Sequence, residues 1–211
     1  MVPESLTPGN STVILVDHAV GFANVLRSHH LADHINNVVA LAKTATCYGT
    51  GLVVTNGPQD KPSGPLYPQL LEVIGDHPII GRSTYNAFLD EDFAAAVRAT
   101  GRDNIVVAGV STEGCVLQTV LGGLRQGYKV HLVVNASAAI TSEAHVVAVQ
   151  RMIQAGVVPL TWTALGAEFQ VDQRLPNAGI WLGLLREHIP ELSNALEYHT
   201  AAQAQALAAV G

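Results

Sequence analysis

Short apolar runs alternate along the chain with longer stretches in which apolar residues recur every three or four positions. Six runs have the length and β-branched content of buried strands, at 12–16, 52–55, 78–80, 104–108, 129–134 and 157–161. The stretches that predict helices lie at 33–48, 91–100, 115–126 and 141–155. Because parallel strands are joined through helices, this order predicts an α/β fold with three layers (αβα) around a mainly parallel, roughly six-stranded sheet.

Capping residues, glycines and prolines indicate where these elements begin and end. Asp33 and Asp90 are placed to cap the first two predicted helices, and Gly49 to end the first. The segment 56–68 is dense in Gly and Pro, which predicts a surface loop that helps to wall a pocket.

The whole chain, 1–211, is interpreted as a single domain with a C-terminal helical tail at about 191–211. The last part of this tail, 201–210, is rich in Ala and has high helix propensity. It predicts a helix that either packs on a partner subunit or frays.

Three chemically capable side chains follow three of the predicted strands. Asp17 follows the first strand, Arg82 the third, and Cys115 lies in the turn after the fourth. Ligands of parallel sheets bind beyond the carboxyl ends of the strands, so we expect these side chains to meet at one edge. Ser111 and Thr112 are candidates to cap the following helix. A helix start would place the Cys115 thiol over free N–H groups, which favours the thiolate.

Several neighbouring residues have competing interpretations. His18 directly follows Asp17, and adjacent strand residues point to opposite faces, so only one of them meets the thiol, and we favour Asp17. Phe22, Tyr85 and Phe88 follow predicted strand ends and either line an apolar pocket or serve as packing residues or interface anchors. Asn86 either orients a substrate amide or caps a turn.

Other histidines and the second cysteine are interpreted as structural. His30 and His34 share a helix face at a spacing that zinc sites use, but further ligands are absent nearby, which favours a solvated helix start. Cys47 lies within an amphipathic helix and is interpreted as a small core residue.

Composition narrows the possible partners. The chain is 48% hydrophobic, with a net charge of −6 and an isoelectric point of about 5.8, which argues against a nucleic-acid surface and favours a small-molecule substrate. Residues 1–5 lack the features of a signal peptide and no apolar run has membrane-spanning length, so we expect a cytoplasmic protein without a membrane partner. In a reducing compartment the two cysteines are expected to remain separate thiols.

The strand ending in Asp17, the basic Arg82 and the turn 109–115 (GVSTEGC) together resemble the isochorismatase-like cysteine hydrolase superfamily. The segment 108–115 (AGVSTEGC) is the specific part of this likeness. A narrower likeness to the YcaC-type branch rests on 15–18 (LVDH), 86–88 (NAF), 90–93 (DEDF), 151–152 (RM), 155–156 (AG), Glu168 and 188–190 (HIP).

The resemblance implies a Rossmann-like topology and a catalytic triad of Asp17, Arg82 and Cys115. It further implies that Cys115 attacks a carbonyl carbon while Asp17 takes and returns the proton. A cis peptide at Val110–Ser111 and an oxyanion hole of the Ser111 and Cys115 N–H groups belong to the same pattern. Relatives form symmetric assemblies, so a homo-oligomer is expected.

The sequence departs from the superfamily pattern at three positions. Arg82 stands where most members have Lys, and a guanidinium stays charged, so it can hold Asp17 ionised but cannot carry a proton. The Asp-x-His zinc motif of the nicotinamidase branch is missing after Thr55, which predicts no metal and no other cofactor. Asn135 stands where many relatives have an acidic residue.

The leading hypothesis is therefore a cysteine hydrolase that cleaves a small amide-type C–N bond through a thioester on Cys115. Two alternatives remain at this stage. One is a small-molecule-binding protein of the same fold without catalysis, and the other is a vinyl-ether hydrolase of the isochorismatase type.

Overall fold

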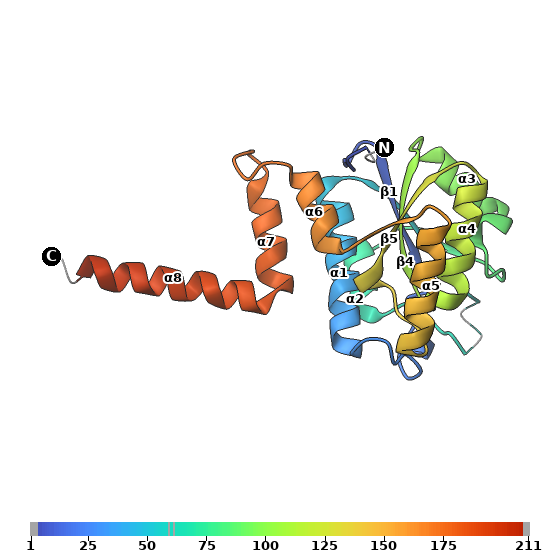
Figure 1. Ribbon diagram of the computed structural model, residues 1–211, viewed down its shortest axis with the longest axis horizontal. Helices are drawn as coiled ribbons and strands as arrows, with labels where there is room; N and C mark the ends of the chain where they lie inside the picture. Colours follow the sequence, from blue (N-terminus) through green and yellow to red (C-terminus); the bar gives the residue numbers. More distant parts are fainter. Residues whose placement is uncertain (1–3, 59, 61, 209–211) are drawn as a thin grey trace. The chain divides into compact units, whose positions relative to one another are not determined.

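The computed structural model describes residues 4–58, 60 and 62–208 and has the predicted three-layer αβα architecture (Figure 1). The strands are β1 (Ser11–Val16), β2 (Gly51–Asn56), β3 (Ile79–Gly81), β4 (Asn104–Gly109), β5 (Lys129–Val133) and β6 (Val158–Leu160). The α-helices are α1 (Leu31–Tyr48), α2 (Pro68–Ile74), α3 (Glu91–Ala99), α4 (Leu117–Arg125), α5 (Ser142–Gln154), α6 (Trp162–Gln170), α7 (Ala178–His188) and α8 (Pro190–Ala208).

The six strands form one sheet in the order β3-β2-β1-β4-β5-β6, and every pair is parallel. The order reverses between β1 and β4, the neighbours at the centre of the sheet. In open parallel sheets such a switch point is where ligands bind, beyond the carboxyl ends of the strands. The predicted fold class is thus confirmed, and the topology singles out the ends of β1 and β4.

Each face of the sheet is covered by helices, because the strands are apolar on both sides. Ile14 and Val16 point into a core shared with the buried residues of α3, α4 and α5, such as Phe93 and Met152. In Figure 1, α1, α2 and α6 lie on the other side of the sheet. This double coverage explains why the strands read as continuous apolar runs.

Several helix boundaries and helices differ from the prediction. Asp33 does not cap the first helix, since α1 begins at Leu31 with His30 at its N-cap and Asp33 in its first turn. Helix α2 was not predicted, although Pro68 at its first position is a favourable start, because the helix has only seven residues and follows a Gly- and Pro-rich segment. Asp90 does cap α3, as predicted, since its side chain accepts a hydrogen bond from the Phe93 N–H.

The chain divides into two compact units, Met1–Phe169 and Gln170–Gly211. The first contains the whole sheet, and the second contains α7 and α8. The predicted tail helix is α8, which covers most of 191–211, while residues 209–211 lie outside the described residues. In the part of the chain that the structure describes, no helix is both long enough and apolar enough to cross a membrane.

Candidate active site

The end of β1 presents Asp17 in an unusual backbone conformation. Asp17 has φ of 54°, in the left-handed region that few residues other than Gly adopt, although Asp and Asn do so more often than most. Its N–H donates to the Thr55 carbonyl on β2, and its carbonyl accepts from the Ala19 N–H. These bonds hold the carboxylate at the end of the sheet where the strands have their carboxyl termini, and Asp17 is 3% exposed there.

The end of β4 approaches β1 very closely at Gly109. A Cβ atom at this position would lie 2.3 Å from the Val16 carbonyl oxygen, which is far too short for any side chain. Glycine is therefore required here, and the turn that follows β4 begins beside Asp17.

The turn after β4 carries Cys115. The peptide bond between Val110 and Ser111 is cis, and residues Thr112–Val116 form a wide helical turn before α4. Gly114 has φ of −106° and ψ of −105°, which are not helical values. The Ser111 carbonyl accepts from the Gly114 and Val116 N–H groups and so closes the turn around Cys115. The predicted helix start is thus a separate turn joined to α4 by a kink.

Arg82 lies directly after β3 and forms a buried ion pair with Asp17. Its Nη2 is 2.5 Å from Asp17 Oδ2, and the two side chains are 3% and 4% exposed. Its other terminal nitrogen, Nη1, donates to the Thr84 carbonyl. The second carboxylate oxygen, Asp17 Oδ1, is buried and has no hydrogen-bond partner among the described residues.

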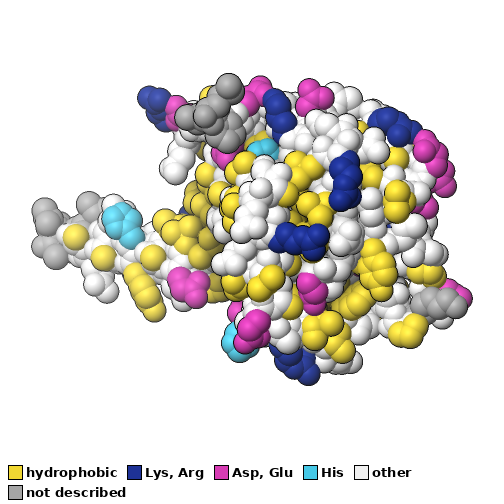
Figure 2. All heavy atoms as spheres, turned by 45° about the vertical axis from the view of Figure 1, so that its right-hand side comes forward, with side chains coloured by type: hydrophobic (Ala, Val, Ile, Leu, Met, Phe, Trp, Pro, Cys, Tyr) yellow, Lys and Arg dark blue, Asp and Glu magenta, His cyan; other side chains and the backbone are white. Residues whose placement is uncertain are grey.

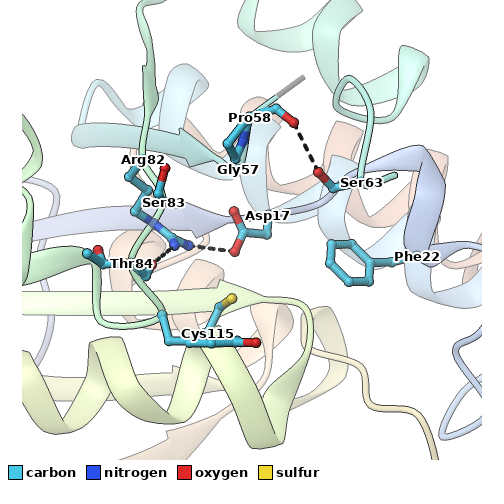
Figure 3. Close-up of a pocket in the computed structure, with 10 residues that line it drawn as sticks. Asp17, Phe22, Gly57, Pro58, Ser63, Arg82, Ser83, Thr84 and Cys115 are labelled. Atoms are coloured by element: carbon cyan, nitrogen blue, oxygen red, sulfur yellow. Dashed lines mark hydrogen bonds and ion pairs between the residues drawn. The ribbon is translucent and has the colours of Figure 1, made fainter. Parts of the chain in front are cut away.

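These three side chains line one pocket with a volume of about 130 Å³ (Figure 3). The Cys115 sulfur points toward the Asp17 carboxylate. Arg82 lies on one side of Asp17 in this view and Phe22 on the other. The remaining lining residues come from the loops after β2 and β3: Gly57, Pro58, Ser63, Ser83, Thr84 and Tyr85. The structure therefore places Phe22 and Tyr85 at the pocket and brings part of the segment 56–68 to its wall.

Asn86 is not among the residues that line this pocket. Its side-chain oxygen accepts from the Phe88 N–H, and the amide packs against Gly122 of α4, where a Cβ would lie 2.2 Å from Asn86 Oδ1. Of the two interpretations left open for Asn86, the structure favours the turn cap.

The pKa of the Cys115 thiol is raised to about 12, and burial is the largest cause. The neighbouring Asp17 carboxylate also raises this pKa, by more than Arg82 lowers it. The expectation that the helix start favours the thiolate in the free protein is therefore wrong. Removal of the thiol from water and the nearby negative charge of Asp17 outweigh the turn's N–H groups. The resting form is the thiol, beside a carboxylate oxygen that is free to accept its proton.

The backbone of the turn offers a hydrogen-bond donor close to Cys115. Ser111 and Cys115 bracket this turn, and the N–H between them, that of Thr112, donates to the Ala138 carbonyl at 2.8 Å. Backbone N–H groups next to a nucleophile are suited to a developing oxyanion when their hydrogens point into the site.

His18 is not among the residues that line the pocket. Its ring is fully buried, and its Nε2 lies 3.0 Å from the Ala136 carbonyl oxygen. It stacks on His34 of α1 with ring centroids 5.7 Å apart. The expectation that only one of Asp17 and His18 faces the thiol agrees with this arrangement.

His34 corrects the interpretation of the helix start as solvated. It is 1% exposed, and neither ring nitrogen has a hydrogen-bond partner among the described residues. It contacts His18, His29 and Tyr67. Spacing along a helix indicates which residues share a face but not whether another segment covers that face, which is why the sequence misled here.

The cysteines are both free thiols, as predicted, but Cys47 is exposed and is not a core residue. Asn135 anchors the start of α6, because its side chain accepts from the Trp162 N–H. Among the described residues, no group of three or more His, Cys, Asp or Glu side chains is arranged to hold a metal ion.

Known proteins resemble this chain in both sequence and structure. Residues 11–164 match the isochorismatase domain family. The chain is 33% identical over 192 residues to the Escherichia coli protein named "Probable hydrolase YcaC", covering 90% of this chain and 92% of that protein.

Two solved structures match most of the chain. YcaC from Pseudomonas aeruginosa, with hexane-2,5-diol and covalent acrylamide, has a TM-score of 0.91 and 31% identity, covering 95% of this chain and 99% of that one. YcaC from Escherichia coli, described as an octameric hydrolase of unknown specificity, has a TM-score of 0.90 and 33% identity, covering 96% and 100%.

Proposed function

The chain belongs to the isochorismatase family of hydrolases, and on this premise we propose that it is a cysteine hydrolase that cleaves a small amide-type C–N bond. Cys115 is the nucleophile, Asp17 the general base and acid, and Arg82 the charge that holds Asp17 in place. One observation carries the proposal. The Cys115 thiol points toward Asp17, whose Oδ1 has no hydrogen-bond partner among the described residues.

Acylation starts from the thiol, because its pKa is raised to about 12. As Cys115 Sγ attacks the carbonyl carbon, the thiol proton moves to Asp17 and the carbonyl oxygen becomes an oxyanion. The Ser111 and Cys115 N–H groups form the oxyanion hole that stabilises it. When the C–N bond breaks, Asp17 returns the proton to the leaving nitrogen, which departs as a neutral amine or ammonia, and a thioester remains.

Deacylation repeats these steps with water as the nucleophile. Asp17 accepts a proton from the attacking water, the tetrahedral intermediate collapses, and Cys115 leaves as a thiol after Asp17 returns that proton. Arg82 keeps its charge throughout, since a guanidinium does not act as a proton carrier. The exchange of Lys for Arg at this position is compatible with catalysis because only Asp17 moves protons.

The pocket and a relative both support a small substrate. A volume of about 130 Å³ accommodates a few non-hydrogen atoms, and Phe22, Pro58 and Tyr85 provide apolar contacts. The Pseudomonas aeruginosa relative holds covalent acrylamide, a small amide that reacts with nucleophiles.

The test is a screen of small primary amides for ammonia release, with wild type and Cys115→Ala measured side by side. We expect wild type to release ammonia and Cys115→Ala to lose at least about 10³-fold in kcat. Intact mass spectrometry of quenched reactions should show an acyl group on wild type that hydroxylamine removes. Cys47→Ser is the matched control, because it removes the other free thiol, which lies outside the pocket.

Equal ammonia release by wild type and Cys115→Ala contradicts the mechanism. A thermal shift with small amides but no turnover by wild type supports instead the non-catalytic binding protein. Hydrolysis of a vinyl ether that persists in Cys115→Ala supports the isochorismatase-type reaction.

We also propose that the protein works as a homo-oligomer. The Escherichia coli relative is an octamer, and Figure 2 shows exposed hydrophobic side chains on the face it presents. Helix α5 exposes Val146, Val147 and Ile153, which are 50%, 63% and 45% exposed. Light scattering coupled to gel filtration tests this proposal, and a monomer at micromolar concentration contradicts it.

A further inference from the structure

The turn that carries Cys115 is tied to the segment that leads into α5. The Thr112 N–H donates to the Ala138 carbonyl, and the Ile140 N–H donates to the Glu113 side chain. A third link joins two side chains, since Thr112 Oγ1 lies 2.9 Å from Nδ1 of His145 on α5. Thr112 is fully buried. Its N–H bonds to the segment before α5 and its hydroxyl to α5 itself.

Anchoring Thr112 orients the peptide unit between Ser111 and Thr112. The Ser111 carbonyl of that unit accepts from the Gly114 and Val116 N–H groups and closes the turn around Cys115. A shift of Thr112 would therefore move the Ser111 carbonyl and, with it, the turn that holds Cys115 and the adjoining Ser111 N–H. His145 is the one side chain that holds the Thr112 hydroxyl among the described residues.

His145 belongs to a cluster of rings, here called the histidine cluster, formed by His18, His29, His34, His145 and Tyr67; all are buried except His29, which is half-buried. His145 meets His29 edge-on with ring centroids 4.9 Å apart, and His29 lies 6.4 Å from His34. His34 in turn contacts His18 and Tyr67. The cluster thus runs from the turn of Cys115 to the residue that follows Asp17.

The rings of this cluster are neutral near neutral pH. Burial lowers the pKa of His18 and of His145 to about 4 and that of His34 to about 2, and it also lowers the pKa of His29. The Asp33 carboxylate on α1 acts in the opposite direction on His29, but its effect is smaller than that of burial. A neutral imidazole packs as an aromatic ring and still has a nitrogen for Thr112.

We propose that His145 is a positioning residue of the active site: it fixes the Thr112 hydroxyl, and through it the Ser111 N–H, while the histidine cluster fixes His145. This inference rests on the proposed cysteine-hydrolase function. His145 does not touch the substrate, since it is absent from the pocket lining. Its effect is on the oxyanion donor and not on the chemistry of the thiol.

Two reagents separate these effects because they differ in where charge develops. Acrylamide adds Cys115 Sγ to its terminal carbon, negative charge develops on the amide oxygen, and the thiol proton reaches the α-carbon through Asp17. Iodoacetamide loses iodide in a displacement, and the thiol proton goes to the medium, so little charge develops on its amide oxygen. The ratio of the two rates therefore reports the oxyanion donor.

The experiment measures adduct formation by intact mass spectrometry at pH 7.5 in a Cys47→Ser background, so that Cys115 is the only thiol. We expect His145→Phe and Thr112→Val each to slow acrylamide addition about tenfold while the iodoacetamide rate stays within about twofold. His145→Asn should recover most of the acrylamide rate, because its amide places a polar atom where Nδ1 lies. His131→Phe is the matched control, since His131 is also buried but lies on β5 outside the cluster.

Each outcome decides a separate point. If acrylamide rates of the His145 and Thr112 variants match the control, or if both reagents slow equally, the positioning role is overturned. If the wild-type ratio equals that of free cysteine, the oxyanion donor itself is absent and the proposed mechanism fails, whatever the variants do. Should His145→Phe fold poorly, Thr112→Val and His145→Asn give the same comparison with smaller changes in volume.

Discussion

Asp17 and His18 are adjacent in sequence but belong to two regions with opposite electrostatics. The pocket side is charged and paired, because Asp17 and Arg82 form an ion pair at 2.5 Å. The histidine cluster has four imidazoles whose pKa values are all lowered by burial. Two solutions to the burial of polar groups thus lie one peptide bond apart: opposite charges that compensate each other, and bases that remain uncharged.

The difference indicates what each region can do. A carboxylate held ionised by a cation can accept a proton and return it in a defined direction, as proposed for Asp17, while Arg82 keeps its charge. A neutral cluster offers shape and rigidity as long as it stays neutral. The predictions below test this contrast, in order of decreasing effect.

The largest effect is expected from Asp17→Asn, which keeps the size of the side chain and suits its left-handed backbone. Loss of the proton acceptor should lower kcat for amide hydrolysis by about 10³-fold, within the range for general acid–base groups. Steady-state ammonia release measures it. His18→Asn, one residue away, should lower kcat far less, and equal losses in the two variants would contradict the division between the two regions.

The next effect concerns stability. Asp17→Ala leaves the Arg82 charge buried without its partner and should lower the free energy of unfolding by about 3–5 kcal/mol. The double variant Asp17→Ala/Arg82→Met should lose less than Asp17→Ala alone. In contrast, His34→Phe removes two buried nitrogens without partners and should cost less than about 1 kcal/mol. Urea unfolding at pH 7.5 measures all three, and a larger cost for His34→Phe than for Asp17→Ala refutes the contrast.

The third effect is a loss of stability in acid that arises from the cluster. The folded pKa of His18 is about 4, below its unfolded value of 6.5, so the folded state binds fewer protons. Its stabilising contribution is full above pH 6.5 and is lost as the pH falls toward 4, by about 3 kcal/mol for this histidine.

Urea unfolding at pH 7, 5.5 and 4.5 measures that loss. His18→Phe should show a shallower decline with falling pH than wild type. His30→Asn, which changes an exposed histidine at the start of α1, is the control and should follow wild type. Identical declines in His18→Phe and wild type would place the acid sensitivity elsewhere.

The smallest effect is expected from Asn86→Ala. Loss of the cap on the Phe88 N–H should lower the free energy of unfolding by about 0.5–2 kcal/mol. Because Asn86 lies outside the pocket lining, KM should change by less than about twofold. Tyr85→Ala, which alters the pocket wall, is the comparison, and a KM change as large in Asn86→Ala would return Asn86 to the substrate site.

The sheet could be predicted from sequence because each strand is a short apolar run, and the structure extends or shortens the predicted runs by only one or two residues. Helices α2, α6 and α7 were not predicted. Helix α2 is short and follows a loop-forming composition, and α7 belongs to the second compact unit, where few apolar residues are buried. Short or poorly buried helices leave a weak periodic signal.

At the site, the parallel sheet explains which residues could be brought together from sequence. Burial and contacts between distant segments explain what could not be predicted. Asp17, Arg82 and Cys115 could be brought together from sequence because strand ends share one edge. The high pKa of Cys115 could not be predicted, since it depends on how far the thiol is buried and on the distance to Asp17. The histidine cluster joins residues from four separate segments, and no local pattern connects His145 with His18 or His34.

Gly109 has a consequence for any survey of mutations in this protein. It has no side chain and takes no part in the chemistry, yet even a methyl group there would meet the Val16 carbonyl at 2.3 Å. A screen for loss of activity will therefore rank Gly109 with Cys115 and Asp17, although only the last two have reactive groups. In this protein a substitution can abolish activity either because it disturbs the close contact between β1 and β4 or because it removes a reactive group. The reactivity of the Cys115 thiol distinguishes these two causes.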